Sequence, residues 1–302
     1  MNEKARKTIL CIAGFLVFAG CQVPQFSATR DFEKVVPVSS QLEVVAKTFN
    51  GSITVTPTDK PEISIVAHAK SFGMTQEEAD EALDGLFPVI DTSDGKLTIE
   101  CKKRNPTNLG FSDSVSLELQ VPVGWPLKLA TSNGNVTVGQ MFGSVSIQTS
   151  NGKVEVFEAT GSVEASTSNG KIFVANSSGT ILANTSNGSI YMMNCNLEGK
   201  CSLKTSNGSI KARFANHPDL PIRAKTSNGI IDCKSSEIRV ENKSKNTLSG
   251  ILLGTPAVDG SANASLEMET SNGSIKINPE EELKSIDLSA RAPAPCLVEE
   301  KS

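Results

Sequence analysis

Few side chains in this sequence of 302 residues have the types and spacing that catalysis requires. The two histidines, His68 and His217, are too few for most histidine-based zinc sites, and they leave little room for the usual acid–base chemistry. Glu155 stands among lysines in its repeat, whereas hydrolysis of a glycosidic bond needs a pair of carboxyl groups. Nucleophile elbows, phosphate-binding glycine loops and the Asp-rich turns of calcium-binding solenoids are absent from the sequence. The residue types therefore predict a protein that is not an enzyme, with no catalytic residues, no metal and no cofactor.

One cysteine near the N-terminus has neighbours that indicate covalent modification. Lys4, Arg6 and Lys7 precede a short apolar run that ends in Ala19-Gly20-Cys21. A basic segment, a short apolar run and small residues before a cleavage point are typical of a secretory signal, and the run is too short to span a bilayer. The ending resembles the lipobox of bacterial lipoproteins, although an ordinary cleaved signal is the alternative. We predict a signal peptide over 1–20, lipidation of Cys21 and a polar tether over 21–30.

The remaining cysteines show no metal-binding or disulfide pattern. Without Cys11 and Cys21, five are left at irregular spacing, with no CxxC pair. Cys195 and Cys201 could form a disulfide in an oxidising envelope. Buried free thiols are the favoured alternative for Cys201 and Cys233, because the repeat described below places both in core positions.

The composition excludes one class of partner and describes the core. The formal net charge is −4, and beyond the N-terminal segment the sequence has no strongly basic stretch, which argues against nucleic acid as a partner. Aromatic residues make up only 5% of the chain, so the core must be built from Val, Ile, Leu and Ala.

An internal repeat dominates the sequence and predicts its architecture. The tetrapeptide Thr-Ser-Asn-Gly recurs at intervals of 18, 18, 18, 20, 21 and 44 residues, and residues 247–253 resemble a degenerate copy inside the longest interval. After each Asn-Gly comes a short alternating segment such as 153–156, then a break, then a second alternating segment such as 162–166, with the period of β-strands. The copies begin at Thr131, Thr149, Thr167, Thr185, Thr205, Thr226 and Thr270.

Two strands and two turns per unit predict an all-β, narrow β-solenoid that resembles a single-stranded β-helix. A row of antiparallel hairpins is the alternative, because Asn-Gly is also a strong hairpin signal. The constant period favours the solenoid, in which each residue type stacks on its own copy one rung away. The predicted inward columns are Val136, Val154, Ile172, Ile190, Ile210 and Ile230; Val138, Val156, Val174, Met192, Ala212 and Cys233; and Leu127, Val145, Val163, Ile181, Cys201 and Ile222.

The Asn-Gly pairs predict a stacked corner. We expect the asparagine amides to hydrogen-bond to one another along the column, which would satisfy polar groups that the corner would otherwise bury. Glycine would supply the positive φ of the corner. Asparagine acting only as a turn former is the alternative. The predicted ladder is Asn133, Asn151, Asn169, Asn187, Asn207, Asn228 and Asn272.

One outward column contains two aromatic residues in adjacent rungs. Phe173 and Tyr191 should stack on the outer surface, with Lys153, Lys171 and Lys211 beside them. Exposed aromatic residues with basic neighbours suit the binding of a glycan or an anionic envelope polymer. A cross-rung pair that only stabilises the sheet is the alternative.

The sections before and after the repeats are predicted to differ from it. Residues 31–130 form a β-rich cap that contains looser copies of the repeat phrase, and a helix near 75–86 begins with a Thr75/Glu78 capping box. The Thr-Ser-Asn-Gly solenoid covers 131–280, and 281–302 is an edge strand or a loose tail.

These features together carry a family resemblance. An Asn-Gly-Ser-Ile-Thr-Val phrase at 50–55, a short helix, a strand ending in Val121-Pro122 and serial Thr-Ser-Asn-Gly units resemble the bacterial putative-adhesin, β-strand-repeat family of unknown function, over 31–280. The resemblance implies a solenoid-like envelope protein and brings no catalytic motif with it.

Our primary hypothesis is a non-catalytic adhesion or scaffold protein of the cell envelope. A lipid anchor would hold it to the membrane, and to the outer one in a cell with two membranes. The partners would be an envelope polymer, a glycan or another envelope protein. An envelope-stress sensor or regulatory ligand-binding lipoprotein is the alternative, and a glycan-active enzyme is third.

Overall fold

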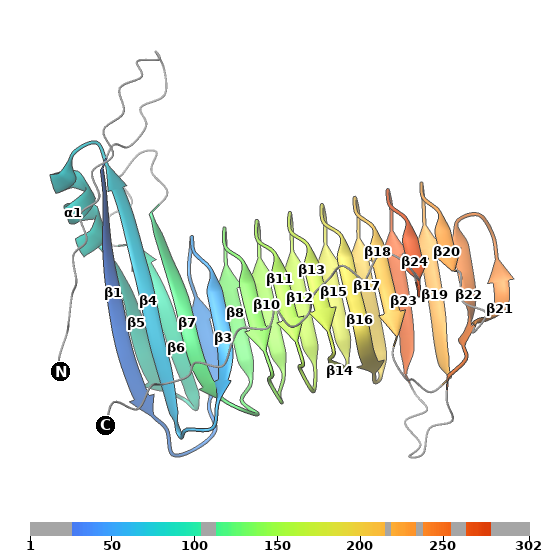
Figure 1. Cartoon of the computed structure of the whole chain (residues 1–302), viewed down its shortest axis with the longest axis horizontal. Helices are drawn as coiled ribbons and strands as arrows, with labels where there is room; N and C mark the ends of the chain where they lie inside the picture. The colour runs from blue at the N-terminus through green and yellow to red at the C-terminus, as the bar shows by residue number, and fades with distance from the viewer. Residues whose placement is uncertain (1–25, 104–112, 215–218, 234–237, 255–263, 279–302) are drawn as a thin grey trace, which may run out of the picture.

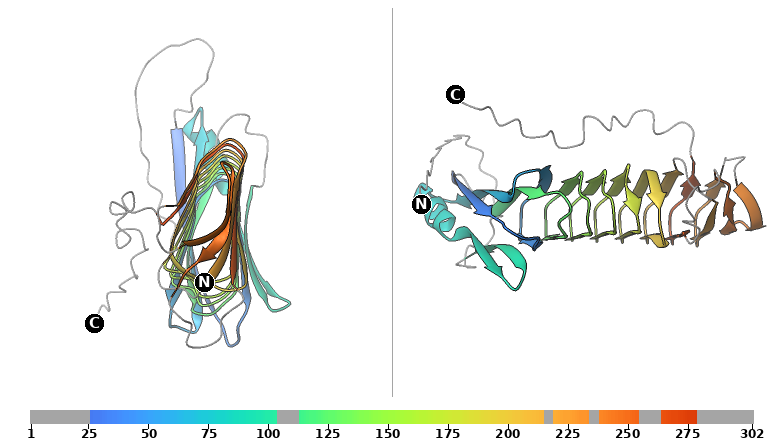
Figure 2. Two further views of the ribbon diagram at one scale, coloured as in Figure 1. Left: turned by 90° about the vertical axis from the view of Figure 1, so that its right-hand side faces the viewer. Right: turned by 90° about the horizontal axis from the view of Figure 1, so that it is seen from below.

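The computed structural model describes residues 26–103, 113–214, 219–233, 238–254 and 264–278. Within them the chain forms an extended row of strands with one helix, and the strands lie in two sheets that face each other across a thin core (Figure 1). The cross-section is narrow and flattened when viewed along the row (Figure 2). The predicted all-β solenoid is confirmed, and the row of antiparallel hairpins is excluded, because successive repeat strands pair in parallel.

Each repeat contributes one strand to each sheet. Sheet A runs, in spatial order, through β1 (Phe26–Pro37), β4 (Glu62–Gly73), β7 (Ser114–Pro122), β3 (Ile53–Thr58), β9 (Val136–Gly139), β11 (Val154–Phe157), β13 (Ile172–Ala175), β16 (Ile190–Leu197), β18 (Ile210–Phe214), β24 (Ile275–Ile277) and β20 (Ile231–Cys233), with β14 (Ser178–Gly179) paired to β16. Sheet B runs through β21 (Ile238–Lys243), β22 (Thr247–Leu252), β19 (Leu220–Thr226), β23 (Ser265–Thr270), β17 (Lys200–Thr205), β15 (Ile181–Thr185), β12 (Val163–Thr167), β10 (Val145–Thr149), β8 (Leu127–Thr131), β2 (Glu43–Lys47), β6 (Lys96–Lys103) and β5 (Leu86–Ser93).

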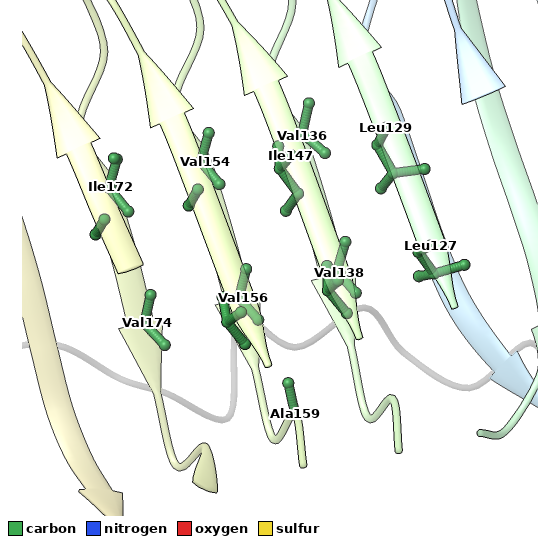
Figure 3. Close-up of a cluster of buried hydrophobic side chains, with 14 of the residues drawn as sticks. Leu127, Leu129, Val136, Val138, Ile147, Val154, Val156, Ala159, Ile172 and Val174 are labelled. Atoms are coloured by element: carbon green, nitrogen blue, oxygen red, sulfur yellow. The ribbon is translucent and has the colours of Figure 1, made fainter. Parts of the chain in front are cut away.

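The core is a single apolar cluster that extends from Ala28 to Ile277. Like side chains stack between rungs, as Val136, Val154 and Ile172 do in sheet A (Figure 3). β-Branched residues suit these columns because their side chains are stiff and pack well on a pleated surface. One predicted core position is wrong by one residue: Ile230 is 68% exposed, and Ile231 instead lies in the column, paired with Ile275.

The N-terminal section closes one end of the solenoid with antiparallel strands. Helix α1 (Gln76–Asp84) packs against β1, β4 and β5, and the Thr75 hydroxyl accepts a hydrogen bond from the Glu78 amide as the capping box predicts. Strands β2 and β3 already form a full rung, because they pair in parallel with β8 and β9. The predicted tether over 21–30 is wrong from residue 26, since β1 begins there, pairs with β4 and buries Ala28.

The 44-residue interval does not contain two further coils. β19 and β20 are followed by an antiparallel return, β21 and β22, in which the supposed degenerate copy at 247–253 pairs with β19. The chain then inserts β23 between β17 and β19, and β24 between β18 and β20. The last Thr-Ser-Asn-Gly unit therefore lies between the fifth and sixth units, as the red strands of Figure 1 show.

The predicted asparagine ladder is present at the corner that leads from sheet B to sheet A. Each amide nitrogen donates to the amide oxygen of the preceding rung, over 2.6–2.8 Å from Asn151 onward. Asn50, from the looser N-terminal phrase, extends the ladder at one end by accepting from Asn133. The seven predicted ladder residues are exposed and Asn50 is half-buried, so the expectation that the ladder satisfies buried groups is wrong. In space the ladder reads Asn50, Asn133, Asn151, Asn169, Asn187, Asn207, Asn272 and Asn228.

The buried part of the corner is made by threonine and glycine. The first residue of each repeat phrase buries its hydroxyl, which donates to the glycine carbonyl of the neighbouring rung over 2.8–3.1 Å. The glycines of the phrase do not have positive φ, contrary to our expectation. They are required because neighbouring corners lie so close: a Cβ on Gly170 would lie 1.7 Å from the carbonyl oxygen of Gly152.

The opposite corner, from sheet A back to sheet B, places residues other than glycine in the left-handed region, in addition to glycines of positive φ such as Gly161 and Gly179. Gln140, Glu158, Asn176 and Asn194 occupy equivalent positions 18 residues apart and have φ of 48°, 54°, 51° and 53°. Left-handed φ is uncommon for residues other than glycine, and asparagine tolerates it best. Asn176 and Asn194 recur at the 18-residue interval, so the sequence contains a second periodic asparagine that indicates this corner and that was not predicted.

Candidate binding surface

The predicted aromatic column lies on the outward face of sheet A, opposite the core. The strand register places Glu155 beside Phe173, Phe173 beside Tyr191, and Tyr191 beside Lys211. Lys153 and Lys171 directly precede β11 and β13. The alternation of the strands therefore brings the five predicted side chains to one face of one sheet, as expected.

The expected exposure of Phe173 is wrong, because this ring is only 3% exposed. It lies in a second apolar cluster, separate from the core, with Phe157, Ala175 and Met193, and the half-buried Tyr191 packs against it. The rings of Phe157 and Phe173 are 5.6 Å apart between centroids and tilted by 50°. We call these five residues the outer apolar strip: Phe157, Phe173, Ala175, Tyr191 and Met193.

Three members of the strip were not predicted from the sequence. Phe157, Ala175 and Met193 form a second outward column two residues after the first. The 18-residue spacing alone could have revealed this column. The residue type in this column is not constant, however. Gly139 of β9 lies beside Phe157, and Arg213 of β18 lies beside Met193.

Cationic side chains surround the strip. Lys153 Nζ lies 2.9 Å from Glu155 Oε2, and Lys211 Nζ lies 5.6 Å from the centroid of the Tyr191 ring, as a cation–π contact. Lys171 is exposed. Although the whole chain is acidic, the outward positions from β11 to β20 carry five cations and two carboxylates: Lys153, Lys171, Lys211, Arg213 and Lys276 against Glu155 and Asp232.

The described cysteines are free, buried or half-buried thiols. Burial raises the pKa of the Cys101 thiol to about 12 and that of Cys195 to about 11, and it also raises the pKa of Cys201. Thiols of raised pKa are poor nucleophiles at neutral pH, because the thiolate is the reactive form. Cys195 and Cys201 do not form the disulfide that the sequence left open.

Few other side chains that could take part in catalysis or in metal binding cluster together in the described part of the chain. His68 Nδ1 lies 2.8 Å from Asp31 Oδ1, and its Nε2 lies 3.6 Å from Glu118 Oε1, on an exposed part of sheet A. Among the described residues, no group of three His, Cys, Asp or Glu side chains could hold a metal ion. Within the same residues, no helix is long and apolar enough for a membrane span.

Several predicted features lie outside the described residues. They are the signal peptide, the lipidated Cys21, His217, Cys296 and the tail over 281–302.

Comparison with protein families gives a match to Toastrack DUF4097 over residues 126–278, just over half of the chain. Comparison with curated protein sequences gives no match.

Several solved structures are similar at low sequence identity. They include a "putative adhesin" from Parabacteroides distasonis (15% identity, TM-score 0.42) and a "putative lipid binding protein" from the same species (15%, 0.41), each covering 82% of this chain and 96% of the other. A "putative cell adhesion protein" from Clostridium sporogenes has 10% identity and a TM-score of 0.38, and covers 82% and 98% of the two chains.

Proposed function

We propose that this chain, which belongs to the Toastrack DUF4097 family, is a non-catalytic, envelope-anchored scaffold that binds an anionic envelope polymer on sheet A. The observation that carries the proposal is the excess of cations on the outward face of that sheet, beside a partly exposed tyrosine. Clustered charge of one sign raises the local concentration of a polymer of the opposite sign.

The regular stacking of rungs suits such a role. In-register strands place Lys153 and Lys171 in neighbouring rungs, and likewise Lys211 and Lys276, at the rung repeat of about 4.8 Å. A continuous core supports this face. A rigid surface loses little conformational entropy when a flexible polymer binds to it.

The binding experiment compares the chain with a charge-reversed variant. Lys171→Glu together with Lys211→Glu should abolish retention of the protein on immobilised anionic envelope polysaccharide, and retention of the unaltered chain should fall as salt rises. Lys128→Glu is the matched control, because Lys128 is exposed on the outward face of sheet B. Equal retention of the double variant and the control would contradict the proposed face.

The anchor rests on the Ala19-Gly20-Cys21 sequence and is tested separately. Replacing Cys21 with alanine should move the protein from the membrane fraction to the soluble fraction, with loss of labelling by an alkyne-bearing fatty acid. Two acyl chains give stable anchoring, whereas one is only marginal. Retention of the Cys21→Ala protein in the membrane fraction would refute lipidation at this residue.

A further inference from the structure

Every Asn-Gly pair in the sequence lies at the corner that holds the asparagine ladder. Asn-Gly is also the dipeptide in which the side-chain amide is lost most readily, because glycine has no side chain to hinder the approach of its own backbone nitrogen to the asparagine Cγ. Within the described residues, none of these glycine nitrogens donates a hydrogen bond. The nucleophile is therefore available at every corner, and the restraints on its target decide which pair reacts.

A corner with a further rung beside it is restrained by that rung. At Asn207, the side-chain Oδ1 accepts a hydrogen bond from Asn272 Nδ2 over 2.7 Å, and the Gly208 carbonyl accepts one from the Thr270 hydroxyl over 2.9 Å. Rotation of the side-chain amide toward the glycine nitrogen must break such bonds. Equivalent pairs of bonds hold the corners at Asn50, Asn133, Asn151, Asn169, Asn187 and Asn272.

The corner at Asn228 lacks both of these restraints. It leads into β20, which is the last strand of sheet A in the described part of the chain. Asn228 Nδ2 donates to Asn272 Oδ1 over 2.8 Å, but no described residue donates to Asn228 Oδ1 or to the Gly229 carbonyl. The Ser227 carbonyl, which a next rung would also use, instead accepts a hydrogen bond from Asn246 Nδ2 over 2.8 Å.

Neither burial nor an end position by itself accounts for this difference. Asn207 and Asn228 are both exposed, and the glycine that follows each of them is half-buried. Asn50, at the opposite end of the ladder, has both ends of its amide hydrogen-bonded, because it accepts from Asn133 Nδ2 and donates to the Asp113 carbonyl over 3.1 Å. What distinguishes Asn228 is the smaller number of hydrogen bonds that hold its corner in place.

We propose that Asn228 is a site of spontaneous deamidation and that stacking protects the remaining Asn-Gly pairs. The Gly229 backbone nitrogen attacks Asn228 Cγ and forms a bond to it, which closes a five-membered succinimide ring. The Cγ–Nδ2 bond breaks, and ammonia leaves with the proton of the glycine amide. Water then adds to either ring carbonyl and opens the ring. The product has aspartate or isoaspartate at position 228, with a new negative charge in place of the amide.

Deamidation at this position loosens the last rung. An aspartate has no N–H group to donate to Asn272 Oδ1, so the last ladder bond is lost and acceptor oxygens face each other. Isoaspartate also carries the main chain through the former side chain, which adds one methylene group between β19 and β20. Local opening then starts at this end of the stack, because each rung is coupled only to its neighbours. This inference goes beyond the proposed function and does not depend on it.

The test uses the unaltered chain and compares two tryptic peptides by mass spectrometry, residues 205–211 with Asn207 and residues 226–234 with Asn228. The folded protein is incubated in buffered H₂¹⁸O and digested afterwards in ordinary water, so that ¹⁸O marks only deamidation that precedes digestion. Because the Asn228 corner lacks two hydrogen bonds that the Asn207 corner has, we expect Asn228 to deamidate about 30-fold faster. In urea the two should convert at similar rates. Similar rates in the folded chain, or no conversion of Asn228 while the urea-treated chain converts, would overturn the proposal.

A variant tests whether the ladder bond itself protects. Asn228→Ala removes the donor to Asn272 Oδ1, while the Thr226 hydroxyl still holds the Gly273 carbonyl. Deamidation of Asn272, located by fragmentation of its tryptic peptide, should therefore become about fivefold faster. Ser227→Ala is the matched control, because Ser227 is exposed in the same corner and its substitution leaves the bond from Asn228 to Asn272 in place. An unchanged rate at Asn272 in the Asn228→Ala protein would refute protection by the ladder.

Discussion

Replacing Gly170 with alanine tests the mechanism that sets the rung spacing. An added Cβ would lie 1.7 Å from the Gly152 carbonyl oxygen, and real Cβ contacts are essentially never shorter than 3.0 Å. The two corners must therefore separate by about 1.3 Å. The alternative view, in which glycine only provides backbone freedom, predicts the opposite sign. Because the φ of Gly170 is not left-handed, alanine would then stabilise the protein by about 0.4–1 kcal/mol.

The magnitude follows from the hydrogen bonds that cross this interface. Asn169 Nδ2 donates to Asn151 Oδ1 over 2.7 Å, the Thr167 hydroxyl donates to the Gly152 carbonyl over 3.1 Å, and the Asn169 amide donates to the Ser150 carbonyl over 2.8 Å. A separation of about 1.3 Å breaks all three. At about 1 kcal/mol each, we expect Gly170→Ala to lower the free energy of unfolding by about 3 kcal/mol.

Urea unfolding measures this change by far-UV circular dichroism and by the fluorescence of Trp125, the only tryptophan. Two probes are needed because solenoids can unfold in stages, with each rung coupled only to its neighbours. Ser168→Ala is the matched control, since Ser168 is exposed in the same corner, and its effect should stay within about 0.5 kcal/mol. A Gly170→Ala protein as stable as the control would refute close stacking as the reason for glycine.

Three further predictions concern the ladder, the register and the thiols. Asn169→Ala should cost about 1–2 kcal/mol and Asn228→Ala about half as much by urea unfolding, because Asn169 makes two ladder bonds and Asn228, at the end, makes one; equal costs would contradict an additive ladder. Ile231→Ala should cost about 2–4 kcal/mol and Ile230→Ala less than about 0.5 in the same assay, and the reverse order would refute the register. Burial raises the pKa of the Cys195 thiol to about 11, so peptide mass spectrometry should find it unmodified by iodoacetamide at pH 8 until urea unfolds the chain. For the same reason its contribution to stability should fall as pH rises from about 9 toward 11, because the unfolded thiol ionises first; rapid alkylation of the folded chain would contradict this.

The solenoid was predictable because its signal is repeated. A tetrapeptide at a constant interval fixes the rung length, the inward columns and the position of the asparagine ladder, and each copy supports the others. The role of glycine was not predictable in the same way. A turn with positive φ and a close approach between rungs select the same residue, and only the geometry at positions such as Gly170 distinguishes them.

The order of the final rungs was not predictable from local pattern. A unit that begins at Thr270 has the same residues whether it follows or precedes Thr226 in space, because both arrangements stack threonine on threonine. The interval of 44 residues indicated an irregularity but not its form. Antiparallel pairing of β22 with β19 is a tertiary choice that the alternating pattern of residues 247–252 leaves open.

The sequence predicted correctly which sheet face Phe173 and Tyr191 lie on, but the predicted exposure of Phe173 was wrong. Alternation along β13 and β16 fixes the outward direction of Phe173 and Tyr191. Burial of an outward residue depends on what lies over the sheet, and the period of a strand carries no information about that. The second outward column, with Phe157 and Met193, is the indication that this face is not an ordinary solvated one.

The back-inserted unit has a consequence for how the protein is made. Strands β19 and β20 contact β23 and β24, and these contact β17 and β18, so the sixth unit has no finished neighbour to add to when it leaves the ribosome. Growth by simple addition must therefore pause after β18, until the remaining residues up to Asn278 have been synthesised and can close as one block. The same arrangement stabilises the end of the stack against local unfolding. Separation of β19 and β20 from the solenoid would break their pairing with β23 and β24, which are themselves paired on both sides. It also constrains where the stack can be extended, since a repeat appended directly after β24 would find β18 and β20 already paired on both sides of that strand.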